Sequence, residues 1–170
     1  DRLYLFEQRL REYDAGVYQA TASSLPSIIA RVLSFREKSS IAVPQGIAQG
    51  WMQHPATFVT DAVSYSTHAL DALDGVLTGC TVAIALTGTI VLQHTQAQGP
   101  RRLTLVPDYH LCVVFAEQIV GTVPEAFERL AATGTLPTTF ISGPSATADI
   151  EMTRVKGVHG PRFFDVIIVS

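Results

Sequence analysis

The sequence predicts an α/β domain, with a three-layer arrangement in which helices cover both faces of a largely parallel sheet. Short runs rich in Val and Ile alternate along the chain with segments whose apolar residues recur at helical spacing. Several of these runs are apolar throughout, which is typical of strands buried on both faces. The 170 residues match one domain in length, and no internal repeat or linker divides them.

Helices are expected where helical periodicity is flanked by capping residues. Ser24 fits an N-cap with Pro26 in the following turn, and Pro124 and Gly134 mark the two ends of a later helix. The expected helices cover residues 3–13, 24–38, 66–74 and 124–134, with a short helix or turn at 45–52 and a short helix beginning after Ser145.

Strands are expected in the short apolar runs between these helices. The expected strands are 17–20, 41–44, 56–61, 75–79, 90–93, 110–115, 138–142 and 163–170. Residues 81–86 fit either a helix or a strand before a turn at Thr87-Gly88-Thr89. Residues 93–102 are polar and contain glycine, which predicts a surface loop and the most mobile segment of the chain.

One uncharged stretch, from Gly75 to Leu92, reaches the length of a membrane span. Its three Gly and four Thr, its Val and Ile content and the lack of flanking Lys or Arg favour buried strands and turns. The chain begins at Asp1 without a Met, and it shows no signal peptide. The composition of this stretch therefore predicts no membrane span. A cytoplasmic location is expected because the chain has only two cysteines, which fit reduced thiols.

Charge and metal-ligating residues exclude several classes of function. A net charge of -3 and a pI near 5.9 leave no basic face for a nucleic acid. Cys80 and Cys112 lie far apart in the sequence and form no CxxC motif, which favours two buried, reduced thiols over a disulfide or a zinc site. The histidines lack HExxH spacing, so no metal site is expected.

Three glycine-containing segments follow expected strands and are candidate ligand-binding turns: Thr87 to Thr89, Ser142 to Ser145, and Lys156 to Arg162. Ligands of open α/β sheets bind outside the carboxyl ends of the strands. Glycine lets backbone N–H groups approach a ligand, and Ser and Thr add short donors. A helix beginning after Ser145 would direct its N-terminal N–H groups at the crevice, which favours a small anionic ligand.

The acidic and imidazole side chains near these turns are candidates for catalysis. Asp149 and Glu151 share a face in a strand but not in a helix, where Ser145 could equally be a simple N-cap. His159 lies between turn glycines and could be an acid, a base, a ligand or merely a solvated loop residue. The expected ligand-binding residues are Thr87, Gly88, Thr89, Ser142, Gly143, Ser145 and Gly160.

Four segments of the chain resemble the LUD domain, and more specifically the lactate-utilization protein C (LutC/YkgG) family. They are "DGVLTGCTVAIALTGTIVL", "LTLVPDYHLCVVFAEQIVGTVPEAF", "TFISGPSATADIEMTRVKGVHGPR" and the closing "DVIIV". The match is strongest over 74–170, and we expect a single LUD-type domain over 1–170. The resemblance implies a NagB/RpiA/CoA-transferase-like fold and a role in oxidising L-lactate to pyruvate.

The resemblance also implies an accessory subunit working with two iron–sulfur lactate-utilization proteins. A chain with two cysteines cannot supply four cluster thiolates, so we expect the clusters on those partners and no cofactor in this chain. Two other functions remain open, because a fold does not determine function. One is a stand-alone transferase or isomerase acting on a phosphate- or CoA-bearing molecule, and the other is a regulatory or scaffolding module.

One position departs from the family pattern. Relatives usually carry an acidic residue before the Thr-Gly of an A-(E/D)-T-G-T motif, where this chain has Leu86 in "ALTGT". If that acid is catalytic or binds a ligand in relatives, the departure puts the corresponding activity in doubt here. The structural alternative is that Leu86 extends the core.

Overall fold

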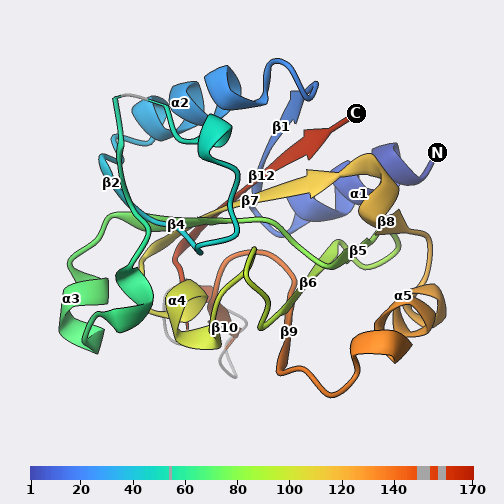
Figure 1. Cartoon of the computed structure of the whole chain (residues 1–170). Coiled ribbons are helices and arrows are strands. Elements are labelled where there is room, and N and C mark those ends of the chain that lie inside the picture. Colours follow the sequence, from blue (N-terminus) through green and yellow to red (C-terminus); the bar gives the residue numbers. More distant parts are fainter. Residues whose placement is uncertain (54, 149–153, 157–159) are drawn as a thin grey trace.

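The computed structural model describes residues 1–53, 55–148, 154–156 and 160–170 (Figure 1). Within this part of the chain, six strands form the central sheet in the order β1-β12-β7-β4-β2-β3. Every neighbouring pair is parallel, so the predicted largely parallel sheet is confirmed. The strands are β1 (Gly16–Ala20), β12 (Phe163–Val169), β7 (Tyr109–Phe115), β4 (Gly75–Thr78), β2 (Ser40–Ala42) and β3 (Thr57–Val59).

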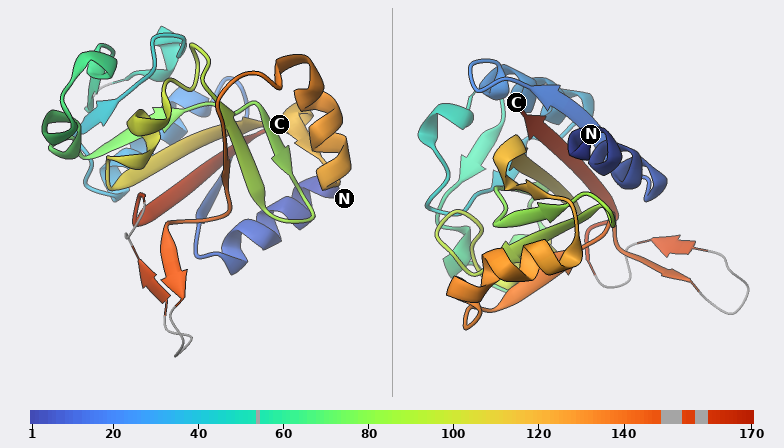
Figure 2. Two further views of the ribbon diagram at one scale, coloured as in Figure 1. Left: turned by 90° about the horizontal axis from the view of Figure 1, so that it is seen from below. Right: turned by 90° about the vertical axis from the view of Figure 1, so that its right-hand side faces the viewer.

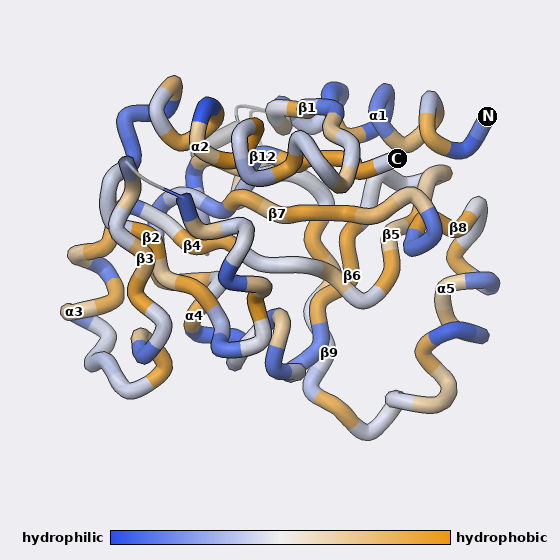
Figure 3. Tube along the Cα trace, turned by 45° about the horizontal axis from the view of Figure 1, so that its top comes forward, coloured by the Kyte–Doolittle hydropathy of each residue, from blue (hydrophilic) through white to orange (hydrophobic). Residues whose placement is uncertain are grey.

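Helices cover both faces of this sheet, which confirms the three-layer α/β class. On one face α2 (Leu25–Phe35) packs through residues such as Ile29 and Leu33, and on the other α1 (Arg2–Glu12) packs through Phe6 and Leu10. Figure 3 shows hydrophobic residues concentrated along β7 and β12 between these layers. Continuous apolar strands are stable here because neither face meets water. The shorter helices are α3 (Thr67–Asp71), α4 (Arg101–Leu105) and α5 (Val123–Leu130).

A second sheet, which the sequence did not predict, shares the α1 side of the molecule. In the described chain its order is β8-β5-β6-β9, with β6 antiparallel to both of its neighbours. It packs through Ala83 and Ile90 into the same core as Val166 of the central sheet. Helix α5 covers its outer side. The strands are β8 (Ile119–Val120), β5 (Val82–Ile84), β6 (Thr89–Gln93) and β9 (Thr138–Ile141).

Two local predictions are wrong. The chain does not enter the predicted helix at Ser145: residues 146–148, which the structure describes, form β10 (Ala146–Ala148). This strand is antiparallel to β11 (Arg154–Lys156), and the pair projects from the body of the molecule (Figure 2). The Ser145 N–H donates to the Pro161 carbonyl at 2.8 Å, so the two chain segments are already paired where they leave the body. Helix α4 also begins inside the predicted loop at 93–102.

The uncharged stretch from Gly75 to Leu92 forms β4, β5 and most of β6. Residues 81–86, which fitted either a helix or a strand, therefore supply a strand. Among the helices described, none has the length and apolar character needed to cross a membrane.

Candidate functional site

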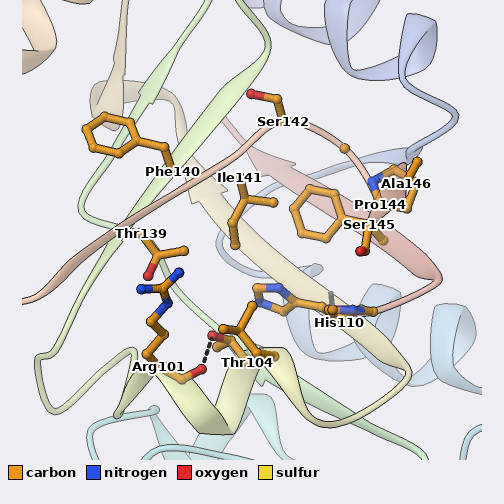
Figure 4. A pocket seen from close by; sticks show the side chains of 15 residues that line it. Arg101, Thr104, His110, Thr139, Phe140, Ile141, Ser142, Pro144, Ser145 and Ala146 are labelled. Carbon is orange, nitrogen blue, oxygen red and sulfur yellow. Dashed lines mark hydrogen bonds between the residues drawn. The ribbon is translucent and has the colours of Figure 1, made fainter. Parts of the chain in front are cut away.

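A cavity of about 320 Å³ opens between α4, the first residues of β7 and the segment that follows β9 (Figure 4). His110 and Phe164 line it, and they lie at the amino ends of β7 and β12. The sequence predicted a crevice at the carboxyl ends of the central strands. That prediction is wrong for this cavity, which lies at their amino ends. It forms at the amino edge of the central sheet because the carboxyl end of β9, in the second sheet, meets that edge.

Ser142, Gly143, Ser145 and Gly160 all line the cavity. Gly143 has φ +77°, and a Cβ built there would lie 2.4 Å from the Cβ of Tyr13, at the end of α1. A glycine is required because an L side chain would be strained and would overlap Tyr13. This glycine lets the Ser142–Ser145 turn lie directly against α1 while its Ser side chains remain near the cavity.

The other predicted turn, Thr87-Gly88-Thr89, joins β5 to β6 and lies beside the cavity wall. The Thr89 hydroxyl is 2.8 Å from that of Thr87 and 2.9 Å from that of Ser142, so three predicted residues meet in one hydrogen-bonded chain. Ser142 is the member of this chain that lines the cavity. Gly88 has φ +60° and packs against Arg9 of α1, which gives it a structural reason to be glycine.

His110 carries the imidazole of the cavity, and the sequence treated it as one of several scattered histidines. Its side chain is 1% exposed, and its Nε2 lies 2.8 Å from the Thr78 hydroxyl in a hydrogen bond within the core. The Phe164 ring packs against it, with ring centroids 5.2 Å apart. These contacts hold the ring at the cavity wall. The sequence did contain a signal for His110, because it is a polar residue at the second position of β7, a strand that is otherwise apolar.

Arg101 brings a positive charge to the cavity from α4 and was also missed as a site residue. It is exposed, and no carboxylate in the described part of the chain forms an ion pair with it. Thr104 is 2% exposed, and its hydroxyl donates to the Arg101 carbonyl at 3.1 Å. Figure 4 shows both side chains on the α4 side, opposite residues 139–146. None of the described lining residues is acidic. The cavity thus combines a cation with hydroxyl groups, which suits a small anion.

A larger groove of about 830 Å³ lies beside β1 and α2. Most of the described residues that line this groove are apolar, and Arg31 adds a charged side chain. Polar groups that converge on one point, rather than volume, distinguish a specific small-ligand site. We therefore take the smaller cavity as the candidate site.

The three candidate catalytic residues, Asp149, Glu151 and His159, lie outside the described residues. Leu86 is 50% exposed in the turn between β5 and β6, so the alternative that it extends the core is wrong. Among the described residues, no group of three or more His, Cys, Asp or Glu side chains is arranged to hold a metal ion.

The fold and the cavity together define an α/β domain with a small polar pocket formed between two sheets. The LUD domain family model matches residues 5–169, and the chain belongs to this family. The sequence resemblance is thereby confirmed.

Relatives and a solved structure agree with this assignment. The chain is 46% identical over 170 residues to lactate utilization protein C of Deinococcus radiodurans, covering 99% of this chain and 79% of that protein. It is 36% identical over 94 residues to lactate utilization protein C of Shouchella clausii, covering 52% of this chain and 41% of that protein. The crystal structure of a DUF162 family protein from Deinococcus radiodurans has a TM-score of 0.87 at 40% identity, over 99% of this chain and 96% of that one.

Proposed function

We propose that this chain takes part in lactate utilisation in the cytoplasm. It acts as an accessory subunit that binds a small carboxylate anion while two iron–sulfur partner proteins oxidise L-lactate to pyruvate. The pairing of Arg101 with hydroxyl groups in one small cavity carries the ligand assignment. The relatives named lactate utilization protein C support the pathway.

The ligand class follows from the size and charge of the cavity. At about 320 Å³ it is at the small end of the range for ligand pockets, which suits a short carboxylic acid better than a nucleotide or CoA ester. A guanidinium binds a carboxylate through two parallel hydrogen bonds. His110 also lines the cavity, and its imidazole ring is suited to hydrogen-bonding a 2-hydroxyl or 2-oxo group.

The division of labour with iron–sulfur partners rests on the cysteines of this chain. The sequence has two, and both thiols are buried in the core between the sheets. A four-iron cluster needs four thiolates that converge on one site, so this chain does not fit such a cluster. Electron transfer is accordingly assigned to the partners.

Anion binding is tested with two adjacent arginines that carry the same charge. Arg101 lines the cavity, whereas the Arg102 guanidinium donates to the Val63 carbonyl and is not among the lining residues. L-lactate, pyruvate and inorganic phosphate should each be titrated by calorimetry. We expect carboxylate binding that is lost in Arg101→Gln and kept in Arg102→Gln. Equal loss of binding in both variants would mean that only the net charge of the protein matters. Binding of phosphate without binding of either carboxylate would favour a phosphate-bearing substrate.

The pathway is tested in the source organism by deleting the gene and growing the cells on L-lactate or on pyruvate. We expect no growth on L-lactate, normal growth on pyruvate and rescue by the wild-type gene. A tagged chain should co-purify with two cysteine-rich iron–sulfur proteins and show no turnover alone. Unimpaired growth on L-lactate would overturn the proposed pathway.

Asp149, Glu151 and His159 remain proposed to orient the ligand or to contact a partner. The turn at Thr87–Thr89 remains proposed as part of the ligand-binding set. Alanine substitutions at Asp149 and at His159 test this assignment. Wild-type affinity and wild-type complementation by both variants would remove these residues from the site.

A further inference from the structure

Two buried thiols meet beneath the candidate site. Cys112 lies on β7, directly across from Thr78 of β4, and Cys80 follows two residues after Thr78. Both thiols belong to one core cluster, and they are close enough for each to shift the pKa of the other. Cys112 is fully buried, and Cys80 is 5% exposed. The fold therefore pairs two cysteines that the sequence analysis treated as separate buried thiols.

A chain of polar contacts joins these thiols to the cavity. The Thr78 hydroxyl lies 2.8 Å from His110 Nε2 and 3.9 Å from Cys112 Sγ. His110 itself lines the cavity. Cys112 Sγ also lies 3.6 Å from the Gly79 carbonyl, and Cys80 Sγ lies 3.4 Å from Gln118 Oε1. The two thiols therefore have polar contacts inside an otherwise hydrophobic core.

This environment makes the two thiols chemically different. Burial raises the pKa of Cys112, but hydrogen bonds from Cys80, His110 and Thr78 outweigh burial and bring the pKa below its usual value. The hydrogen bond to Cys112 and burial together raise the pKa of Cys80. A thiolate is the nucleophilic form of cysteine, so Cys112 is suited to attack and Cys80 to resolve.

We propose that Cys80 and Cys112 form a peroxide-oxidisable pair that closes a disulfide between the end of β4 and the middle of β7. The Cys112 thiolate attacks one oxygen of a hydroperoxide, which breaks the O–O bond, forms a sulfenic acid and releases the other oxygen as an alcohol or as water. The Cys80 sulfur then attacks the sulfenic sulfur and releases water. The two thiols lose two electrons and two protons, which reduce the peroxide.

The local chain geometry permits this closure. Closing the disulfide brings the two sulfurs to about 2.05 Å from each other. Gly79 lies between Thr78 and Cys80, and a Cβ placed there would meet nothing within 4 Å, so the backbone has room to adjust. Hydrogen peroxide is close to water in size, and the contact chain begins at the cavity wall.

The test uses the purified full chain, reduced and then treated with hydrogen peroxide. Free thiols are alkylated in denaturant before digestion with trypsin. Cleavage around Arg101 and Arg102 places Cys80 in fragment 39–101 and Cys112 in fragment 103–129, so the disulfide joins two separate peptides. We expect the joined peptides from the monomer and their separation after reduction.

Single variants identify the attacking thiol. In Cys80→Ser we expect a Cys112 sulfenic acid that dimedone traps, whereas Cys112→Ser should leave Cys80 unmodified. Thr78→Val should slow joining in the folded chain and leave the rate in urea unchanged. The proposal is overturned if both wild-type thiols stay free in the folded chain, or if joining occurs equally well in urea or between molecules. None of these readouts depends on anion binding, so this inference and the proposed function can fail separately.

Discussion

Arg36 and Asp165 form a two-point ion pair between the end of α2 and β12. The Arg36 Nε and a terminal nitrogen lie 2.7 and 2.5 Å from the two carboxylate oxygens, and the Tyr109 hydroxyl donates to the same carboxylate at 2.9 Å. The Asp165 side chain is fully buried, whereas that of Arg36 is 28% exposed. Gly16 completes the pocket, because a Cβ there would lie 2.2 Å from Asp165 Oδ1.

This asymmetry predicts unequal effects of removing the two partners. Arg36→Gln leaves a buried carboxylate without its cation, and we expect a loss of about 3–5 kcal/mol in the free energy of unfolding. Asp165→Asn should cost less, because the partly exposed guanidinium can reach water. Urea denaturation of both variants measures the difference. An equal or smaller loss for Arg36→Gln would contradict this account.

Gly143→Ala should destabilise the wall of the cavity. The left-handed backbone at φ +77° costs an L residue about 1–2 kcal/mol, and the overlap with Tyr13 adds to this cost. The matched control is Gly50→Ala, where a Cβ meets nothing within 4 Å and φ is not positive. Thermal unfolding should show a clear loss of stability for Gly143→Ala and a change within about 0.5 kcal/mol for Gly50→Ala. Similar effects at both sites would refute the steric argument.

Thr78→Val should destabilise the fold by about 1–3 kcal/mol, because it leaves the buried His110 nitrogen without its hydrogen-bond partner. Thr78→Ser keeps the hydroxyl and should retain most of the stability. The His110 ring signals in NMR spectra should shift in the Val variant and stay near their wild-type positions in the Ser variant. If Thr78→Ser costs more stability than Thr78→Val, packing of the Thr78 methyl group rather than its hydrogen bond would be the larger contribution.

Asp74 should contribute a pH-dependent part of the stability. Partial burial raises the pKa of its carboxyl, but hydrogen bonds from the backbone and side chains of Ser39 and Ser40 outweigh burial and lower the pKa. Because the folded pKa lies below the unfolded value of about 3.9, this stabilisation is present above that pH and disappears as the pH falls through the folded pKa. Urea denaturation between pH 7 and pH 2 should show a shallower acid-side decline in Asp74→Asn. If the stability of Asp74→Asn fell with pH as steeply as that of the wild type, this contribution would be ruled out.

Much of the central sheet could be predicted from the sequence because its strands are continuously apolar. The runs in β7 and β12 require cover on both faces, and that requirement alone implies helices on either side. The second sheet could not be predicted in the same way. Its strands are short, and β5 fits a helix equally well until β6 and α5 pack against it.

The candidate site, like the fold, could be predicted only in part from the sequence. Gly143 and the Ser142–Ser145 turn were identified from sequence because glycine and serine have recognisable turn chemistry. His110 and Arg101 were missed, since nothing in their local sequence shows that they face one cavity. The expected edge of the sheet was also wrong, because the rule for parallel strands does not apply to a turn supplied by an antiparallel sheet.

The sequence by itself determined the α/β class, the family and the two glycine-containing turns, because these depend on local periodicity, motif and backbone conformation. Tertiary structure alone decided which groups meet. It placed Arg101, His110 and Ser142 around one cavity, directed the chain after Ser145 into a strand, and brought Cys80 and Cys112 into one core cluster. The physical reason is that these contacts join distant segments, whose distance in space depends on strand register and layer packing rather than on local preference.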